Sequence, residues 1–169
     1  SGPVVFEFDR DGVVSAGTFR INIRNPIELL LPAAGGGFGG VSDGDTFTID
    51  PDFNDAVPPT VFEFDSDGVA TAGSIPIQFN NFTTQSVLAQ RVVTAIQAAA
   101  VSVTPVDAGN GIVRLLGISP THLVDTTGTS ALQQRTAGLS QDDVANLLVS
   151  AIQANGLGVV PVNAGNGRV

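Results

Sequence analysis

Four aspartates in two short acidic turns are the residues of this chain best suited to bind a metal ion. Asp9 and Asp11 lie in the segment FDRDG, and Asp65 and Asp67 lie in the segment FDSDG. Carboxylates two residues apart offer the hard oxygen ligands that Ca²⁺ prefers, although the EF-hand pattern with its twelfth-position Glu is missing. Asp-Gly is also what a turn without metal contains. We therefore expect plain turns, with a calcium site as the alternative.

Five further aspartates lie in one loop region and are additional candidate ligands for calcium. They are Asp43, Asp45, Asp50, Asp52 and Asp55.

The residues needed for catalysis are sparse. Cys is absent and His122 is the only histidine, so a triad would combine it with a serine such as Ser119 and an acid such as Asp125. No nucleophile-elbow motif accompanies them. The glycine-rich segment 35–40, GGGFGG, lacks the Lys-Ser/Thr pair of a phosphate-binding loop and is predicted to be a flexible connector. We expect no enzymatic activity and no required cofactor.

One short motif predicts a covalent modification. Asn81, Phe82 and Thr83 form an N-glycosylation acceptor sequence. It falls in a loop expected between a strand and a helix, which is the exposed kind of position that glycosylation requires. The sequence therefore predicts a glycan on Asn81.

Two sequence segments each occur twice in the chain, 56 positions apart. VFEFDRDG from Val5 recurs as VFEFDSDG from Val61, and PVDAGNGIV from Pro105 recurs as PVNAGNGRV from Pro161. The intervening residues do not repeat, so one copy is divided around the other. We name residues 43–117 the complete unit, and residues 1–24 with 137–169 the split unit. Residues 25–42 and 118–136 are predicted connectors or donated strands.

The local patterns predict a β-rich α+β fold with two small antiparallel sheets, each carrying one amphipathic helix. Alternating VVFEF segments predict strands, and each Asp-Gly pair after them predicts a hairpin. Apolar residues at helical spacing follow Ser86 and Ser140, and Asp143 completes an approximate capping box in the second helix. Asn110-Gly111 and Asn166-Gly167 predict a hairpin after each helix.

The order of these motifs resembles a known repeat. DGDTFTI, then VFEFDSDG, then a helix ending in AIQ, then AGNG before a final strand, is similar to a tandem repeat of very large bacterial cell-surface and adhesin-like proteins. It also resembles the protomers of glycan-coated extracellular fibrils, whose subunits join head to tail. The resemblance implies an extracellular or cell-surface location and a scaffolding or adhesive role.

Composition limits the partners. The net charge is −9 and the seven basic residues are all Arg and scattered along the chain, which disfavours nucleic acid. No apolar run approaches the roughly 20 residues of a membrane helix, so no membrane insertion is expected. The absence of Met, including an initiator Met, predicts a chain processed or excised from a longer one.

Two functions follow as expectations. In the first, the chain is a structural subunit of an extracellular fibril and polymerises with itself, because a split unit that lacks counterparts of DGDTFTI and RLLG leaves open strand edges. The donor of the missing strand is expected in residues 26–31 or 117–124. The expected assembly residues are Pro26, Ile27, Leu29, Leu30 and Leu31. In the second, the chain is a calcium-dependent adhesin or carbohydrate-binding module.

Overall fold

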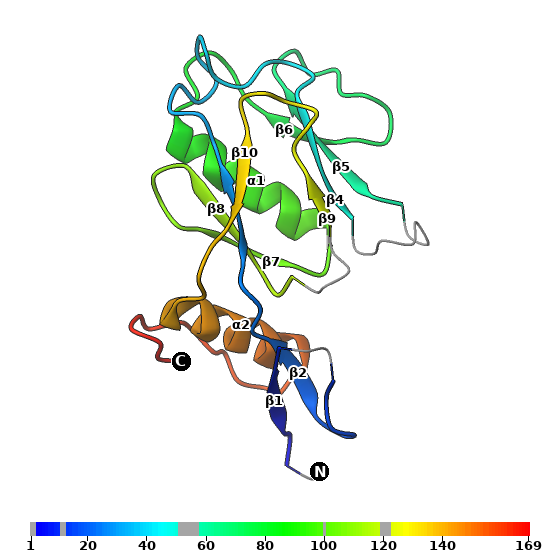
Figure 1. Cartoon of the computed structure of the whole chain (residues 1–169), viewed down its shortest axis with the longest axis vertical. Coiled ribbons are helices and arrows are strands. Elements are labelled where there is room, and N and C mark those ends of the chain that lie inside the picture. The colour runs from blue at the N-terminus through cyan, green and yellow to red at the C-terminus, as the bar shows by residue number, and fades with distance from the viewer. Residues whose placement is uncertain (1–2, 11–12, 51–57, 100, 119–122) are drawn as a thin grey trace.

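The computed structural model describes residues 3–10, 13–50, 58–99, 101–118 and 123–169, and within them the protein is a β-rich α+β fold, as predicted. The elements, in chain order, are β1 (Phe6–Asp9), β2 (Phe19–Asn22), β3 (Ile27–Leu30), β4 (Thr46–Asp50), β5 (Thr60–Asp65), β6 (Ile75–Gln78), α1 (Gln85–Ala99), β7 (Thr104–Asp107), β8 (Ile112–Leu116), β9 (Leu123–Asp125), β10 (Gln133–Thr136) and α2 (Gln141–Ala154). Figure 1 shows a larger lobe around α1 and a smaller lobe that holds β1, β2 and α2.

The larger lobe has one hydrophobic core shared by α1 and two sheets. One sheet has the strand order β6-β5-β4-β9 and the other has the order β10-β3-β8-β7. Leu88, Val92 and Ile96 recur at helical spacing on α1 and are almost fully buried in this core. Each such side chain contributes about 1.5–3 kcal/mol on burial.

The larger lobe also contains the two segments that were expected to be connectors or donated strands. β3 lies between β8 and β10, with Leu29 opposite Val113, and β9 pairs with β4. Leu29 is fully buried, which suits an apolar strand in the middle of a sheet. The boundaries 25–42 and 118–136 therefore need correction, because these segments supply strands to the sheets of their own chain.

The strands on either side of each Asp-Gly turn pair in parallel, so the two hairpins predicted at these turns are wrong. β5 is parallel to β6, with Phe62 opposite Ile75, and β1 is parallel to β2, with Phe6 opposite Phe19. After the Asp-Gly turn, the segment 66–74 carries the chain back to the other end of the strand. This return is within reach because an extended chain spans about 3.3 Å per residue.

A glutamate holds each return segment in place. Glu63 accepts a hydrogen bond from the backbone N–H of Thr71 at 3.0 Å. Glu7 accepts one from the N–H of Ser15 at 2.8 Å and one from the hydroxyl of Thr18 at 3.0 Å. These bonds, that of Ser15 first, lower the pKa of Glu7 because they stabilise the ionised carboxylate. The repeated glutamate thus anchors a loop.

The smaller lobe joins the two ends of the split unit. Phe6 and Ile21 from the N-terminal part pack with Leu147 and Leu148 of α2 and with Leu116 of β8. A capping box begins α2, as predicted, with the Ser140 hydroxyl accepting a bond from the N–H of Asp143 at 3.1 Å. The N-terminal strands and the second helix therefore share one small core.

No helix among the residues described above is long and apolar enough to cross a membrane.

A cluster of ion pairs connects the two lobes. Arg114 of β8 lies 2.8 Å from the carboxylate of Asp143 in α2 and 3.4 Å from that of Glu28 in β3. Arg135 of β10 also pairs with Glu28, at 2.7 Å. The carboxylates of Asp143 and Glu28 are nearly buried, whereas Arg135 is largely exposed. Arg114 is therefore the cation that fixes the start of α2 to the sheet.

We predict that Arg114→Gln lowers the free energy of unfolding by about 3 kcal/mol, because it leaves the buried carboxylate of Asp143 without a cation and leaves Glu28 with the exposed Arg135 alone. Arg135→Gln removes one exposed partner of Glu28 and should cost at most about 1 kcal/mol. Urea unfolding of both variants checks this. Equal costs for the two substitutions would show that Arg114 does not hold the lobes together.

Candidate functional site

In the complete unit, strand β5 has a hydrogen-bonded strand on each side. The N–H of Phe64 donates to the C=O of Asp45 at 2.8 Å, and the C=O of Phe64 accepts from the N–H of Gly44 at 2.9 Å. Strand β4 continues this antiparallel pairing with Phe47 opposite Phe62, whose ring centroids lie 4.8 Å apart. With β6 on its other side, β5 is paired along both edges.

Strand β1 is the counterpart of β5 and is paired along one edge. Its sheet contains β1 and β2 alone among the described residues. The C=O groups of Val5 and Asp9 accept hydrogen bonds at 2.8 Å from the β2 segment. Because backbone groups alternate in direction along a strand, those of Phe6 and Phe8 point toward the opposite edge. This edge is open.

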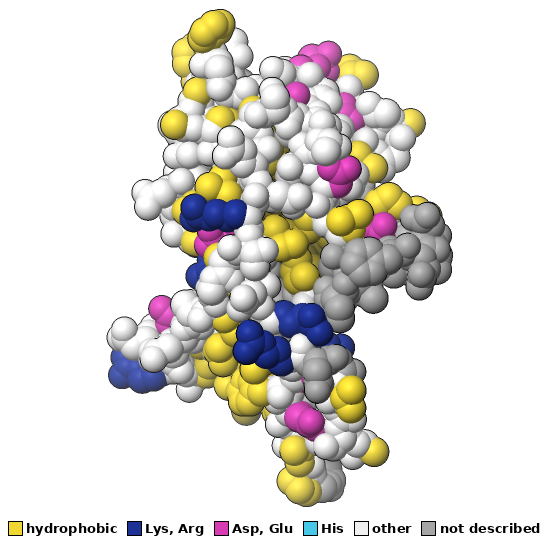
Figure 2. Space-filling model, in the orientation of Figure 1, with side chains coloured by type: hydrophobic (Ala, Val, Ile, Leu, Met, Phe, Trp, Pro, Cys, Tyr) yellow, Lys and Arg dark blue, Asp and Glu magenta, His cyan; other side chains and the backbone are white. Residues whose placement is uncertain are grey.

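Apolar side chains surround the open edge. Phe8 corresponds to Phe64 in the repeat, but Phe8 is 53% exposed and Phe64 is fully buried. Figure 2 shows hydrophobic side chains on the surface of the smaller lobe. Other exposed apolar residues near β1 and β2 are Val4, Val5, Val13, Val14 and Phe19. An unpaired strand edge flanked by apolar side chains is a template for another strand.

The segment after α2 is a second unpaired stretch. Residues 160–163 correspond to β7, which pairs with β8. Within the described part of the chain these residues belong to no strand, and the nearby bridge joins Gly165 to Arg168. Val160 is 89% exposed. Besides the β1 edge, the split unit thus has a second segment whose residues belong to no strand among those described.

The expected donor residues lie inside the larger lobe. Pro26 is buried, and Ile27, Leu29 and Leu30 belong to β3, between β8 and β10. Leu31 follows and is buried as well. In this arrangement the donor segment completes a sheet of its own chain, so what the structure exposes is an acceptor edge.

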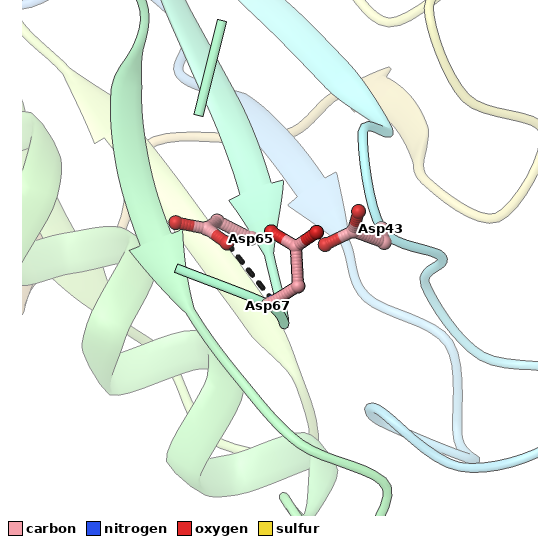
Figure 3. A group of neighbouring side chains, drawn as sticks. All are labelled: Asp43, Asp65 and Asp67. Carbon is pink, nitrogen blue, oxygen red and sulfur yellow. Dashed lines mark hydrogen bonds between the residues drawn. The ribbon is translucent and has the colours of Figure 1, made fainter. Parts of the chain in front are cut away.

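Three carboxylates meet at the carboxyl end of β5. Oxygen atoms of Asp43, Asp65 and Asp67 all lie within 4.8 Å of one another. Figure 3 shows Asp67 between the other two side chains. Asp65 and Asp67 were the predicted calcium ligands of this repeat, and the antiparallel pairing of β4 with β5 adds Asp43. These three oxygen donors are of the kind that a divalent cation takes.

Each of these carboxylates also holds a turn. Asp65 accepts hydrogen bonds from the N–H groups of Asp67 at 3.2 Å and Gly68 at 2.7 Å, and Asp67 accepts one from the N–H of Val69 at 2.8 Å. The first of these bonds is the dashed line in Figure 3. The acidic residues therefore have a structural use without a metal ion.

Asp43 ties the loop before β4 to the turn after β5. Its carboxylate accepts bonds from the N–H of Ser66 at 2.6 Å and from the Ser66 hydroxyl at 3.0 Å. The backbone bond from Ser66 is the largest cause that lowers the pKa of Asp43, because it stabilises the charged form.

The other two predicted calcium ligands are placed differently. Asp9 is buried and pairs with Arg20. Asp11 lies outside the described residues. The structure thus gathers carboxylates at the complete unit, whereas at the split unit Asp9 faces an arginine. The sequence shows that the copies differ at Arg20 and Pro76, but the parallel pairing of β1 with β2, which brings Arg20 close to Asp9, was not predicted.

The glycosylation motif lies on a tight loop. Asn81 is exposed, and Thr83 is buried with its hydroxyl bonded to the amide of Asn80, accepting from the N–H at 2.9 Å. The glycine-rich segment packs against this loop, with the N–H of Gly36 donating to the C=O of Thr83 at 2.9 Å. A Cβ on Gly36 would lie 2.3 Å from the C=O of Asn80. The expected flexible connector is therefore a closely packed loop.

The residues considered for a catalytic triad are only partly described. Ser119 and His122 lie outside the described residues. Asp125 accepts a hydrogen bond from the N–H of Thr127 at 2.8 Å, and this bond lowers the pKa of the Asp125 carboxyl. Asp125 thus holds a turn after β9.

No protein-family model matches the sequence, and no curated protein matches it.

We predict that Asp67→Asn changes the free energy of unfolding by no more than about 0.5 kcal/mol, because an amide oxygen still accepts the bond from Val69. The melting temperature of the unmodified protein should also stay the same when a chelator replaces added calcium. A loss of several kcal/mol in the variant, or a melting temperature that falls sharply on chelation, would show that the acidic triad binds a structural cation.

Proposed function

We propose that the chain is a structural subunit of an extracellular bacterial fibril, which polymerises head to tail through inter-subunit β-strand addition. The observation that supports this most directly is the contrast between Phe64 and Phe8. The same repeated strand is paired on both edges in the complete unit and on one edge in the split unit.

The complete unit indicates the geometry of the added strand. β4 lies antiparallel to β5 and sets an aromatic ring against Phe62. A strand from a neighbouring subunit that takes the same place on β1 would pair with the backbone of Phe8 and cover its ring. Such a contact joins different surfaces of the two subunits, so it does not close and propagates into a filament.

The surface location and the glycan are parts of the same proposal. Asn81 is exposed on the loop between β6 and α1, and its acceptor sequence is complete. This loop belongs to the larger lobe, whereas the β1 edge belongs to the smaller lobe. The extracellular location rests on the resemblance of the repeat to surface proteins and fibril protomers.

A calcium-dependent adhesin or carbohydrate-binding module is the second candidate function. The observation that favours it is the triad of Asp43, Asp65 and Asp67. Size separation of the purified chain distinguishes the two functions. A ladder of oligomers or ordered fibres supports the fibril subunit, and a monomer whose stability depends on calcium supports the binding module.

We predict that Phe8→Lys abolishes assembly, because a charge beside an open edge opposes strand addition. The matched control is Val69→Lys, which places the same charge on a side chain that is 76% exposed in the larger lobe. Electron microscopy and size separation should show fibres for the unmodified chain and for Val69→Lys, and monomers for Phe8→Lys. Fibres of Phe8→Lys that match those of the control would remove β1 as the acceptor.

A further inference from the structure

A cleft of about 330 Å³ lies beside the end of β1, where the two lobes meet. Its lining residues are Arg10, Arg24, Asn25, Ile27, Ile118 and Thr136. The lining therefore combines two guanidinium groups, an amide and a hydroxyl with two apolar side chains, and it contains no carboxylate. Figure 2 shows basic side chains gathered between the two lobes.

Both arginines are unpaired within the described part of the chain. Neither Arg10 nor Arg24 forms an ion pair there, although Arg20, Arg114 and Arg135 all do. The Nε atom of Arg24 is buried and has no hydrogen-bond partner. A buried donor without an acceptor is costly. In a chain with 16 acidic residues and seven arginines, two free guanidinium groups in one cleft indicate a site for an anion.

The repeat shows which anion belongs at this position. At the 56-residue offset, Arg10 corresponds to Ser66 and Arg24 corresponds to Asn80. In the complete unit, Ser66 donates two hydrogen bonds to the carboxylate of Asp43. Asp43 lies just before β4, the strand that pairs with the edge of β5. The split unit thus has an arginine, Arg10, where the complete unit receives the carboxylate that precedes β4.

We propose that the cleft of Arg10 and Arg24 binds a carboxylate carried by the strand that adds to β1. This inference rests on the proposed function and specifies its partner, which is an acidic segment of a second copy of this chain. In the complete unit, Asp43 precedes β4 and lies beside Ser66, which follows β5. If an added strand lies antiparallel to β1 in the same way, the residue just before that strand lies beside Arg10. Two guanidinium groups would bind that carboxylate and fix the register of the added strand.

The partner is assigned from charge and from the repeat. The chain has a net charge of −9, and Asp43 and Asp67 of the complete unit are exposed. The sequence of residues 43–50, DGDTFTID, has the carboxylates and the alternating apolar residues that this edge position takes in the complete unit. A free peptide of this sequence is therefore a suitable probe of the open edge in the intact protein.

The test measures binding of two peptides to the full chain. One peptide is DGDTFTID, and its twin has both aspartates that correspond to Asp43 and Asp45 replaced by asparagine. The acidic peptide should bind about tenfold more tightly than its twin, which is the worth of a charge-assisted bond. This difference should vanish in 1 M NaCl and in Arg10→Glu. It should persist in Arg91→Glu, which changes the net charge equally on an exposed residue of α1.

The outcomes separate this inference from the proposed function. Equal binding of the two peptides, or equal effects of Arg10→Glu and Arg91→Glu, overturns the carboxylate site, and fibres of the unmodified chain would still support strand addition. Failure of both peptides to bind monomers of a chain that can form fibres also overturns it. Succinate that binds the cleft while the two peptides bind equally would assign the site to a free carboxylate instead. A chain that stays monomeric contradicts the proposed function itself.

Discussion

Pairing of backbone groups at strand edges is the constraint on which this structure depends. A strand that leaves its N–H and C=O groups open recruits another strand unless something covers it. In the larger lobe the edge of β5 is paired by β4, and Phe64 is buried beneath the sheet. In the smaller lobe the same sequence exposes Phe8. One chain therefore contains both the completed form and the open form of the same element.

The ion pairs at Arg114 explain how an added strand could join subunits without loosening each one. Arg114 connects a strand of the larger lobe to Asp143, which also caps α2. The core that contains Phe6 and Leu147 then connects α2 to β1 and β2. A strand bound at β1 is thus connected to the larger lobe through buried contacts. Asp143 thus takes part both in the capping box of α2 and in the junction between the lobes.

Local patterns predicted most elements, and long-range pairing accounts for what they missed. The capping box at Ser140 and the turn at Asn110 depend on neighbouring residues, so the sequence was enough to place both. The parallel pairing of β5 with β6 depends instead on the return loop that Glu63 holds. Likewise, the segment IELL is an apolar strand whose partner cannot be predicted from its own residues. Its place in the sheet depends on pairing with β8, which is far away in the sequence. Asp43 lies beside Asp65 and Asp67 because of the register between β4 and β5, which the local sequence does not indicate.

Amide hydrogen exchange at Phe8, compared between monomer and polymer, tests the central claim most directly. The amide of Phe64 is paired with Asp45 and serves as the internal standard, because it should be protected in both states. The account predicts that the amide of Phe8 exchanges rapidly in the monomer and becomes as protected as that of Phe64 in the polymer. Rapid exchange at Phe8 in the polymer, or protection already in the monomer, would contradict strand addition at β1.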